Sequence, residues 1–327
     1  MSYTSHQISF LKRLLPKVIY TCHSGNSRIF GQVAKRQRQQ AATLSFGGSS
    51  PSLALIFSVT FLYNPRRFLC MKLLIHKEKR EIVDGREFIV AKARQYFVTD
   101  LSKDVHTLYG TIPKSDLSGP SGSVIKSDTG KEFVLLDASF IDVYKRLRKL
   151  PQTIPLKDIG FIVGETGINS QSVVVDGGLG SGALAAALAH IAKHVTSYEI
   201  REDCIKTAES NIKMLGLNNV TIKMKSLYDG IDEKDVDLIT LDLPEPWKVI
   251  PHAAKSLKVG GFLISYSPSV HQVQDFVNEL QKHDNLLYLK TVELIERLWE
   301  IEGRRVRPKS TGIGHSGFIV FARKIRA

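Results

Sequence analysis

A glycine loop in the second half of the chain has the composition of a ligand-binding turn. It spans residues 176–182, Asp-Gly-Gly-Leu-Gly-Ser-Gly, between an apolar run at 172–176 and an alanine-rich stretch at 182–192. Glycines let the backbone turn sharply and approach a ligand without an intervening Cβ, and the start of the following helix presents free N–H groups. The GxGxG spacing is one residue shorter than the dinucleotide fingerprint. Taken alone, the loop indicates either a ligand site or a tight strand-to-helix turn.

An acidic residue, Glu199, ends the next apolar run at 195–199. A carboxylate at this place in an α/β fold accepts hydrogen bonds from the two hydroxyls of a bound ribose. Dinucleotide enzymes and methyltransferases share this device, and a solvated glutamate at a strand end is the alternative. Glu199 therefore favours a nucleoside-containing cofactor without identifying it.

A second carboxylate, Asp242, ends the run at 236–242 and begins the segment Asp-Leu-Pro-Glu-Pro-Trp at 242–247. The carboxyl ends of strands line the ligand crevice of an open α/β sheet. A carboxylate there can accept a hydrogen bond from an amine, which makes the neighbouring ring nitrogen more nucleophilic and lets proton loss offset the charge gained on methyl transfer. The segment resembles the Asp/Asn-x-Pro-x-aromatic motif of amino-group methyltransferases. A proline-stiffened loop with a capping aspartate is the alternative.

The elements that must position these residues alternate between strands and helices from residue 155 onward. The composition predicts helices at 157–167, 182–192, 201–215, 252–257 and 270–281, and strands at 172–176, 195–199, 220–224, 236–242 and 261–266. Such alternation predicts a parallel sheet with helices on both faces. The fold class is therefore α/β, a Rossmann-like sheet over residues 151–327.

Residues 71–150 have a different pattern and predict a small β-rich domain. The stretch 86–90 alternates, and 130–136 follows an Asp-Thr-Gly turn at 128–130, which is typical of a hairpin. The Ser/Gly/Pro cluster at 117–123 indicates a loop. The basic stretch 140–149 leads into a linker at Pro151.

Residues 1–70 hold much of the positive charge of the chain. Of the net charge of +13, +9 falls in this segment, which has no acidic residue, so residues 71–327 carry only +4. The segment has three interpretations: an artefactual start ahead of Met71, a transit peptide, or a basic arm, and all three predict poor order. Its apolar run at 53–63 is too short for a membrane span, so we expect no stable membrane association.

Three cysteines without metal-ligand or CxxC spacing argue against a disulfide framework and fit a reducing compartment, and we expect a cytoplasmic protein. No metal site is expected.

The sequence resembles one family from about Met71 to Lys324, the tRNA (adenine-N1)-methyltransferases that modify the T-loop, especially their archaeal members. The glycine loop is shared by many methyltransferases, but two other segments are more specific. The resemblance is carried by residues 149–158, 176–183, 198–200, 241–247, 258–262 and 307–323, the last reading Arg-Pro-Lys-Ser-Thr-Gly-Ile-Gly-His-Ser-Gly-Phe-Ile-Val-Phe-Ala-Arg. It implies a Rossmann-like sheet ending in an antiparallel hairpin strand at 317–322, an N-terminal β-domain that helps to hold tRNA, and a homotetramer.

The resemblance also implies the residues of the site. Asp242 is the catalytic carboxylate that faces the exocyclic amine of the target adenine, and the methyl group is transferred to N1 of adenine 58, with adenine 57 as a neighbouring target. S-adenosylmethionine is the cofactor: the glycine loop cradles its methionine part, Glu199 binds its ribose and Gln152 closes over it. The expected cofactor residues are Gln152, Gly178, Leu179, Gly180, Ser181, Gly182, Ala183, Glu199, Ser226, Leu227 and Asp242.

Two positions depart from the family pattern. Leu179 replaces a hydroxyl residue that could bond the cofactor carboxylate, and Ser226 stands where an aspartate commonly reads the adenine amine of the cofactor. These changes concern cofactor affinity rather than the fold. They leave two alternatives to an active tRNA methyltransferase: a non-catalytic tRNA-binding subunit of the same fold, and a methyltransferase for another substrate such as protein isoaspartate.

The expected tRNA contacts lie near the C-terminus and in the catalytic motif. Phosphate neutralisation explains a basic run such as Arg304, Arg305, Arg307 and Lys309, although a solvated loop would have the same composition. His315 is either a hydrogen-bond donor to tRNA or satisfied within the protein. Trp247 either stacks on a flipped base or packs in the core.

Overall fold

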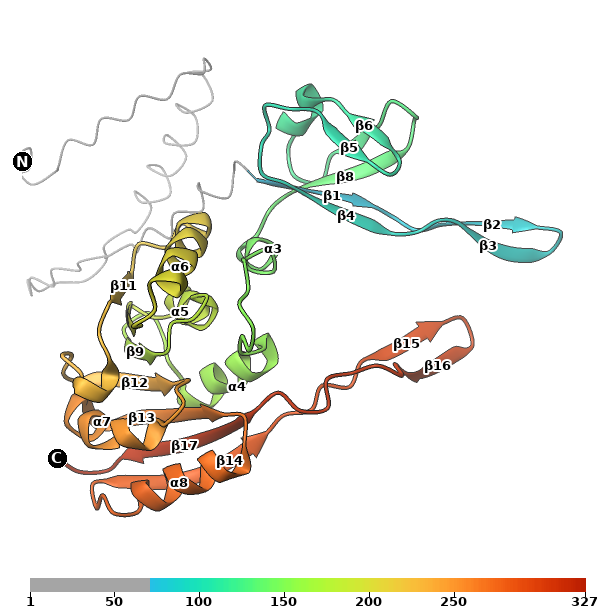
Figure 1. The fold of residues 1–327 in the computed structure, drawn as a ribbon. Helices are drawn as coiled ribbons and strands as arrows, with labels where there is room; N and C mark the ends of the chain where they lie inside the picture. The colour runs from blue at the N-terminus through green and yellow to red at the C-terminus, as the bar shows by residue number, and fades with distance from the viewer. Residues whose placement is uncertain (1–70) are drawn as a thin grey trace, which may run out of the picture. The chain divides into compact units, whose positions relative to one another are not determined.

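The computed structural model describes residues 71–327, and the interpretations of residues 1–70 lie outside the described residues (Figure 1). Two sheets organise this part of the chain, one of four strands and one of seven. Within residues 71–327, no helix is both long and apolar enough to cross a membrane.

The four-stranded sheet lies within residues 71–150 and has its own core. Its strands are antiparallel in the order β4-β1-β8-β7, and its core includes the buried side chains of Leu74, Ile112, Phe133 and Leu135. The predicted hairpin at 128–130 is confirmed, because β7 and β8 pair across it. The elements are β1 (Lys72–His76), β2 (Lys79–Val83), β3 (Arg86–Ala91), β4 (Arg94–Val98), β5 (Val105–Thr107), β6 (Gly110–Ile112), η2 (Lys114–Ser118), β7 (Val124–Lys126), β8 (Glu132–Asp137) and α3 (Phe140–Tyr144).

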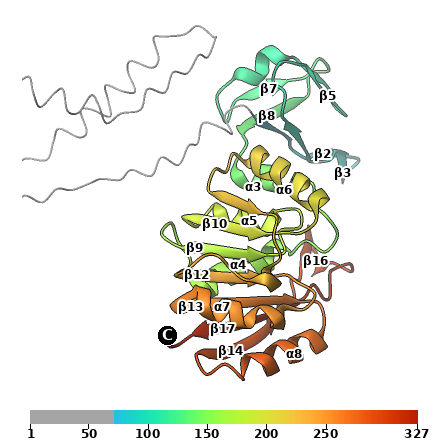
Figure 2. The ribbon, with the colours of Figure 1, turned by 60° about the vertical axis from the view of Figure 1, so that its left-hand side comes forward.

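The seven-stranded sheet has the order β11-β10-β9-β12-β13-β17-β14. Its neighbouring strands pair in parallel from β11 to β13, whereas β17 runs antiparallel to both β13 and β14. Figure 2 shows these strands stacked edge to edge. The strands are β9 (Val173–Gly177), β10 (His194–Tyr198), β11 (Val220–Lys223), β12 (Val236–Leu241), β13 (Leu257–Ser267), β14 (Leu286–Glu293) and β17 (Phe318–Lys324). The antiparallel strand expected at 317–322 is therefore confirmed as β17.

Helices cover both faces of this sheet, because successive apolar residues of each strand point to opposite sides. Val174 packs with the helices α4, α5 and α6, and Val175 packs with α7 and α8 on the other face. The helices are α4 (Leu156–Thr166), α5 (Ala183–Ala189), α6 (Glu202–Leu215), α7 (Ile250–Ser256) and α8 (Val270–Leu280), with short turns η3 (Leu227–Asp229) and η4 (Pro246–Val249). The predicted Rossmann-like α/β layering is confirmed.

Two features of this sheet were not expected from the sequence. The first is that β14 is the outermost strand of the sheet. The second is that residues 294–317 leave the sheet between β14 and β17 as an arm, which ends in the hairpin of β15 (Trp299–Glu302) and β16 (Arg305–Pro308) (Figure 1).

The strand order also positions the glycine loop. The loop follows β9, and it lies between the residues that follow β10 and those that follow β12, at the carboxyl ends of these strands.

Candidate active site

The glycine loop is pressed against the chain that follows β12. A Cβ built on Gly178 would lie 2.2 Å from the carbonyl oxygen of Asp242, and the φ of Gly178 is +93°. Residues with a side chain rarely adopt this backbone conformation. The close approach follows from the pairing of β9 with β12, since the Asp242 N–H also donates to the carbonyl of Gly177 at 2.8 Å. Only glycine fits at position 178, and this fixes the loop beside Asp242.

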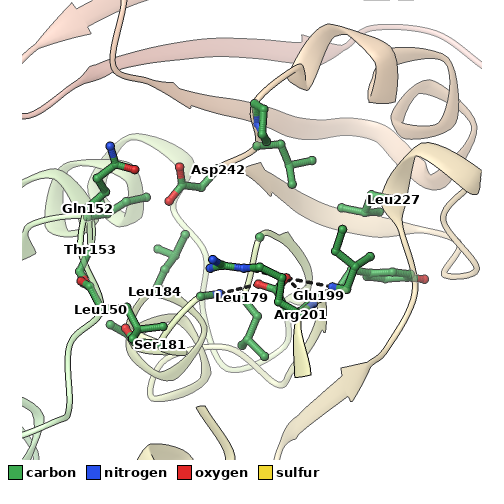
Figure 3. Close-up of a pocket in the computed structure, with 18 of the residues that line it drawn as sticks. Leu150, Gln152, Thr153, Leu179, Ser181, Leu184, Glu199, Arg201, Leu227 and Asp242 are labelled. Carbon is green, nitrogen blue, oxygen red and sulfur yellow. Dashed lines mark hydrogen bonds and ion pairs between the residues drawn. The ribbon is translucent and has the colours of Figure 1, made fainter. Parts of the chain in front are cut away.

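A cavity of about 610 Å³ opens above this loop, at the carboxyl ends of the central strands (Figure 3). Ligand sites of α/β sheets lie at this edge, and the volume falls in the range of cofactor pockets. Ten of the expected cofactor residues line the cavity: Gln152, Gly178, Leu179, Gly180, Ser181, Ala183, Glu199, Ser226, Leu227 and Asp242. Gly182 does not line it, because it caps the start of α5.

Glu199 is 9% exposed and is held by backbone N–H groups. One carboxylate oxygen accepts hydrogen bonds from the N–H of Ile200 at 2.9 Å and of Arg201 at 3.0 Å, and the other accepts from the N–H of Gly180 at 3.1 Å (Figure 3). A carboxylate can accept about four hydrogen bonds, so this one keeps capacity for a ligand hydroxyl. The bond to Gly180 also ties the glutamate to the glycine loop.

Asp242 directs its carboxylate into the cavity (Figure 3). Burial, with a smaller contribution from the nearby charge of Asp176, raises its pKa from 3.8 to about 7. A carboxylate whose pKa lies near neutrality can both accept and release a proton under ordinary conditions. The Asp242 carboxylate can therefore accept a proton from a group bound in the cavity beside the glycine loop.

Asp176, at the start of the glycine motif, braces three strands. Its carboxylate accepts a hydrogen bond from Ser197 on β10 at 2.6 Å and another from Thr240 on β12 at 2.9 Å. It is fully buried, and burial raises its pKa to about 6 despite these two hydrogen bonds. Asp176 is thus a fixed support beneath the site, and the sequence motif alone did not reveal this role.

The two positions that depart from the family pattern have different surroundings. Leu179 is 3% exposed and its side chain belongs to the hydrophobic core with α5 and α6. Ser226 caps the short turn η3, where its hydroxyl oxygen accepts the N–H of Tyr228 at 3.1 Å. Ser226 keeps its own O–H to donate.

Gln152 lies at the rim of the cavity in a left-handed conformation with a φ of +64°. Non-glycine residues in this region are uncommon and cluster at functional sites. The side chain is exposed. Gln152 is therefore placed where a residue that closes over a ligand would be.

The residues expected to contact tRNA lie outside the cavity. Arg304 is exposed beside Gly303 at the turn between β15 and β16, and Lys309 is exposed just after β16. Arg307 donates to Glu300 at 2.9 Å, so its charge already has a carboxylate partner. Trp247 is partly buried against the core on the α7 and α8 side of the sheet, which favours the packing interpretation.

His315 is exposed, but both of its ring nitrogens are engaged within the protein. Nδ1 lies 2.6 Å from a carboxylate oxygen of Glu293, and Nε2 lies 3.0 Å from the carbonyl of Pro268. The hydrogen bond to Glu293 raises the pKa of the imidazole. The interpretation that His315 is satisfied within the protein therefore agrees with the geometry.

Several residues of the cavity were not found from the sequence. Gln272 on α8 donates to the carbonyl of Pro244 at 3.0 Å, and the hydroxyl of Tyr228 accepts the N–H of Glu245 at 3.2 Å, so both support the Asp-Leu-Pro-Glu-Pro-Trp loop. They come from elements distant in sequence, and no local spacing signals them. Among residues 71–327, no group of three or more His, Cys, Asp or Glu residues is arranged to hold a metal ion.

Comparison with known proteins gives this geometry a family context. Residues 145–313 match the family described as tRNA methyltransferase complex GCD14 subunit. The chain is 34% identical over 269 residues to the tRNA (adenine(57)-N(1)/adenine(58)-N(1))-methyltransferase TrmI of Methanocaldococcus jannaschii, covering 73% of this chain and 92% of that protein. It is 29% identical to a tRNA (adenine(58)-N(1))-methyltransferase TrmI of Thermus thermophilus, covering 72% of this chain and 95% of that protein.

Solved structures agree with this fold. A Thermotoga maritima protein described as an S-adenosylmethionine-dependent O-methyltransferase has a TM-score of 0.65 and 32% identity, covering 79% of this chain and 93% of that one. The tRNA (m1A58) methyltransferase TrmI of Aquifex aeolicus has a TM-score of 0.61 at 24% identity, covering 78% of this chain and 97% of that one, and it supports the fold alone.

Proposed function

Since the chain belongs to the family of tRNA (adenine-N1)-methyltransferases, we propose that it transfers a methyl group from S-adenosylmethionine to N1 of adenine in the T-loop of tRNA. The proposed target is adenine 58, with adenine 57 as a second target, as in the name of the Methanocaldococcus jannaschii relative. The observation that carries the proposal is the Asp242 carboxylate, which faces the cavity beside the glycine loop.

The cavity fits S-adenosylmethionine, which supplies an electrophilic methyl group when bound. Gly178 and Gly180 let the backbone of the loop approach the methionine part closely, and Glu199 keeps acceptor capacity for ribose hydroxyls. In this proposal Ser226 and Leu227 border the adenine ring of the cofactor, and Gln152 covers the ligand from the rim. Gly182 contributes only by starting α5 behind the loop.

Asp242 is the proposed catalytic residue. Its carboxylate accepts a hydrogen bond from the exocyclic amine of the target adenine, which raises the electron density at N1. As N1 gains the methyl group and a positive charge, the carboxylate stabilises that charge and is able to take the amine proton. The pKa of about 7 suits this exchange near neutrality.

Arg304, Arg307 and Lys309 are the proposed phosphate contacts on the arm, because backbone neutralisation positions tRNA without reading its sequence. Arg304 and Lys309 are the stronger candidates, since Arg307 pairs with Glu300. Trp247 and His315 stay predictions as tRNA contacts. A cytoplasmic location also stays a prediction.

We propose a homotetramer, as the family resemblance implies, and two hairpins that expose apolar side chains support an interface between subunits. Ile82 is 76% exposed on β2, and Ile301 is 76% exposed on β15. Phe88 on β3 and Trp299 on β15 are about half exposed. Apolar surface of this kind marks protein interfaces. Size-exclusion chromatography with light scattering tests the proposal, and a monomer at micromolar concentration contradicts it.

The function is tested with unmodified tRNA transcript, purified protein and radiolabelled S-adenosylmethionine, followed by mass spectrometric mapping of the product. Label at N1 of adenine 58 is expected. Asp242→Ala should lose two or more orders of magnitude in rate, whereas Glu245→Gln should retain activity, because this half-exposed carboxylate of the same loop pairs with Lys248 and does not line the cavity. Binding of tRNA without cofactor binding by calorimetry would identify a non-catalytic subunit, and failure to bind tRNA at low salt would indicate another substrate.

A further inference from the structure

The two ends of the arm, residues 294–317, are joined at its base by a buried polar network. Its members are Lys157 and Asp158 on α4, Tyr266 on β13 and Ser316 just before β17. Asp158 is fully buried. None of these side chains lines the cavity, and the proposed mechanism does not use Lys157, Asp158 or Ser316.

Lys157 bridges the outgoing and returning ends of the arm. Its ammonium lies 2.7 Å from three acceptors: a carboxylate oxygen of Asp158, the carbonyl of Leu294 where the arm begins, and the hydroxyl of Ser316 where it ends. An ammonium has three protons to donate, so each one has a partner here. Lys157 therefore links both ends of the arm to α4, next to the backbone pairing of Glu293 with Phe318 that already joins β14 and β17.

Asp158 completes the network from the other side. Its second carboxylate oxygen accepts the Ser316 hydroxyl at 2.9 Å and the Tyr266 hydroxyl at 3.0 Å. A Cβ built on Gly317 would lie only 2.5–2.7 Å from ring atoms of Tyr266, so the returning strand also packs directly on that ring. Every donor and acceptor at the centre of the network is satisfied, and such a network fixes one geometry.

The network lies next to the wall of the cavity. Tyr266 precedes Pro268 by two residues on the same stretch of chain, and Pro268 lines the cavity. A second connection runs in parallel, since His315 bonds both Glu293 at the end of β14 and the carbonyl of Pro268. The arm and the cavity wall are thus joined twice through consecutive residues, His315 and Ser316.

We propose that Asp158, acting with Lys157, is a positioning residue that holds the base of the arm against the cavity wall, so that tRNA engaged by the arm presents its adenine to Asp242. The part of this inference that concerns tRNA rests on the proposed function, whereas the part that says the network fixes the arm is independent of it. A buried ion pair of this kind contributes little net stability relative to apolar residues, while it can enforce a specific arrangement. This arrangement accounts for the His-Ser-Gly portion of the C-terminal motif, which the cofactor site leaves unexplained.

The test compares Asp158→Asn and Ser316→Ala with the control Glu165→Gln. Glu165 is a half-exposed carboxylate of the same helix that pairs with Lys290 on β14 and does not contact the arm. Expected for Asp158→Asn is a loss of at least tenfold in kcat/KM for tRNA with the Kd for S-adenosylmethionine unchanged within twofold. Amide hydrogen exchange over residues 295–314 should become faster, while exchange in β9 and the behaviour of the control stay as in the wild type.

The double variant decides whether the two side chains act through one connection. Asp158→Asn with Ser316→Ala should lose no more in kcat/KM than the worse single variant, because both remove the same connection. The inference would be overturned if the losses in kcat/KM of the two single variants multiplied in the double variant. It would also be overturned if amide hydrogen exchange in the arm stayed unchanged, or if binding of S-adenosylmethionine weakened in parallel. Ser316→Ala removes a single hydroxyl and serves if Asp158→Asn does not fold. A wild-type protein that methylates no tRNA refutes the proposed function instead, and the exchange measurement still decides whether the network fixes the arm.

Discussion

Asp242→Asn replaces the carboxylate in the cavity by an amide of nearly the same shape, and it is expected to abolish methyl transfer while making the folded protein more stable. The amide cannot take a proton from an adenine amine, so the rate should fall by at least two orders of magnitude. Stability should rise because the folded protein no longer keeps an ionised carboxylate in a partly buried position.

The size of this gain follows from the pKa of Asp242. Burial, with the charge of Asp176 second, raises the pKa from 3.8 to about 7. One pKa unit corresponds to about 1.4 kcal/mol, so ionisation in the folded state costs on the order of 4 kcal/mol at pH 8. The folded protein holds this proton to higher pH than the unfolded chain. The cost is therefore small near pH 4, grows as the pH rises, and is complete above about pH 7.

Thermal unfolding of the wild type and of Asp242→Asn measures the difference. A rise of roughly 8–16 °C in Tm is expected for the variant at pH 8, since each kcal/mol shifts Tm by about 2–4 °C in a protein of this size. At pH 5 the gain should fall to less than half, as the wild-type carboxyl is then protonated when folded. Glu245→Gln should show neither effect. A gain that is absent or independent of pH would refute the assignment of a buried, proton-accepting Asp242.

Three further variants test the cavity. Glu199→Gln should weaken S-adenosylmethionine binding at least tenfold by calorimetry and should lower Tm, because the amide nitrogen cannot accept the backbone N–H groups that one carboxylate oxygen accepts; unchanged affinity would exclude Glu199 from the cofactor site. Gly178→Ala should lose activity and about 1–3 kcal/mol of stability in denaturant unfolding, because its Cβ would meet the carbonyl of Asp242. The control Gly164→Ala should be neutral or stabilising, because a Cβ at that position meets nothing within 4 Å. Leu179→Thr should lower stability by about 1–3 kcal/mol without tightening cofactor binding, since the side chain is buried in the core; tighter binding would show that it faces the ligand.

The sequence predicted the central sheet well because the relevant signals are local. Short apolar runs between turn residues located the strands, and the residues that follow them, Glu199 and Asp242, lie together because parallel strands end at one edge. The predicted helix at 201–215 corresponds to α6, which ends where Gly216 adopts the left-handed conformation. Residue type and spacing were sufficient for these elements.

The parts that were missed depend on contacts between distant segments. Edge strand β14 exposes Leu287, Tyr288 and Leu289 in a row, so its sequence lacks the clean alternation of a strand with one buried face. Gln272 supports the catalytic loop from α8, and no spacing in the sequence connects the two. The pairing of Arg307 with Glu300 was not predicted either, because it arises only when β15 and β16 form a hairpin.

Asp176 and Asp242 show how one edge of a sheet gives two carboxylates different roles. Asp176 lies near the end of β9, Asp242 directly follows the neighbouring strand β12, and burial raises the pKa of each. Asp176 receives hydrogen bonds from Ser197 and Thr240, which partly offset its burial and hold its pKa at about 6. No hydroxyl group lowers the pKa of Asp242 in this way, and burial together with the charge of Asp176 raises it to about 7. Because the two charges oppose one another, fixing Asp176 as an acceptor for neighbouring strands also raises the proton affinity of Asp242. Asp176, which lies within the sheet on β9, therefore raises the pKa of the carboxyl group that faces the cavity.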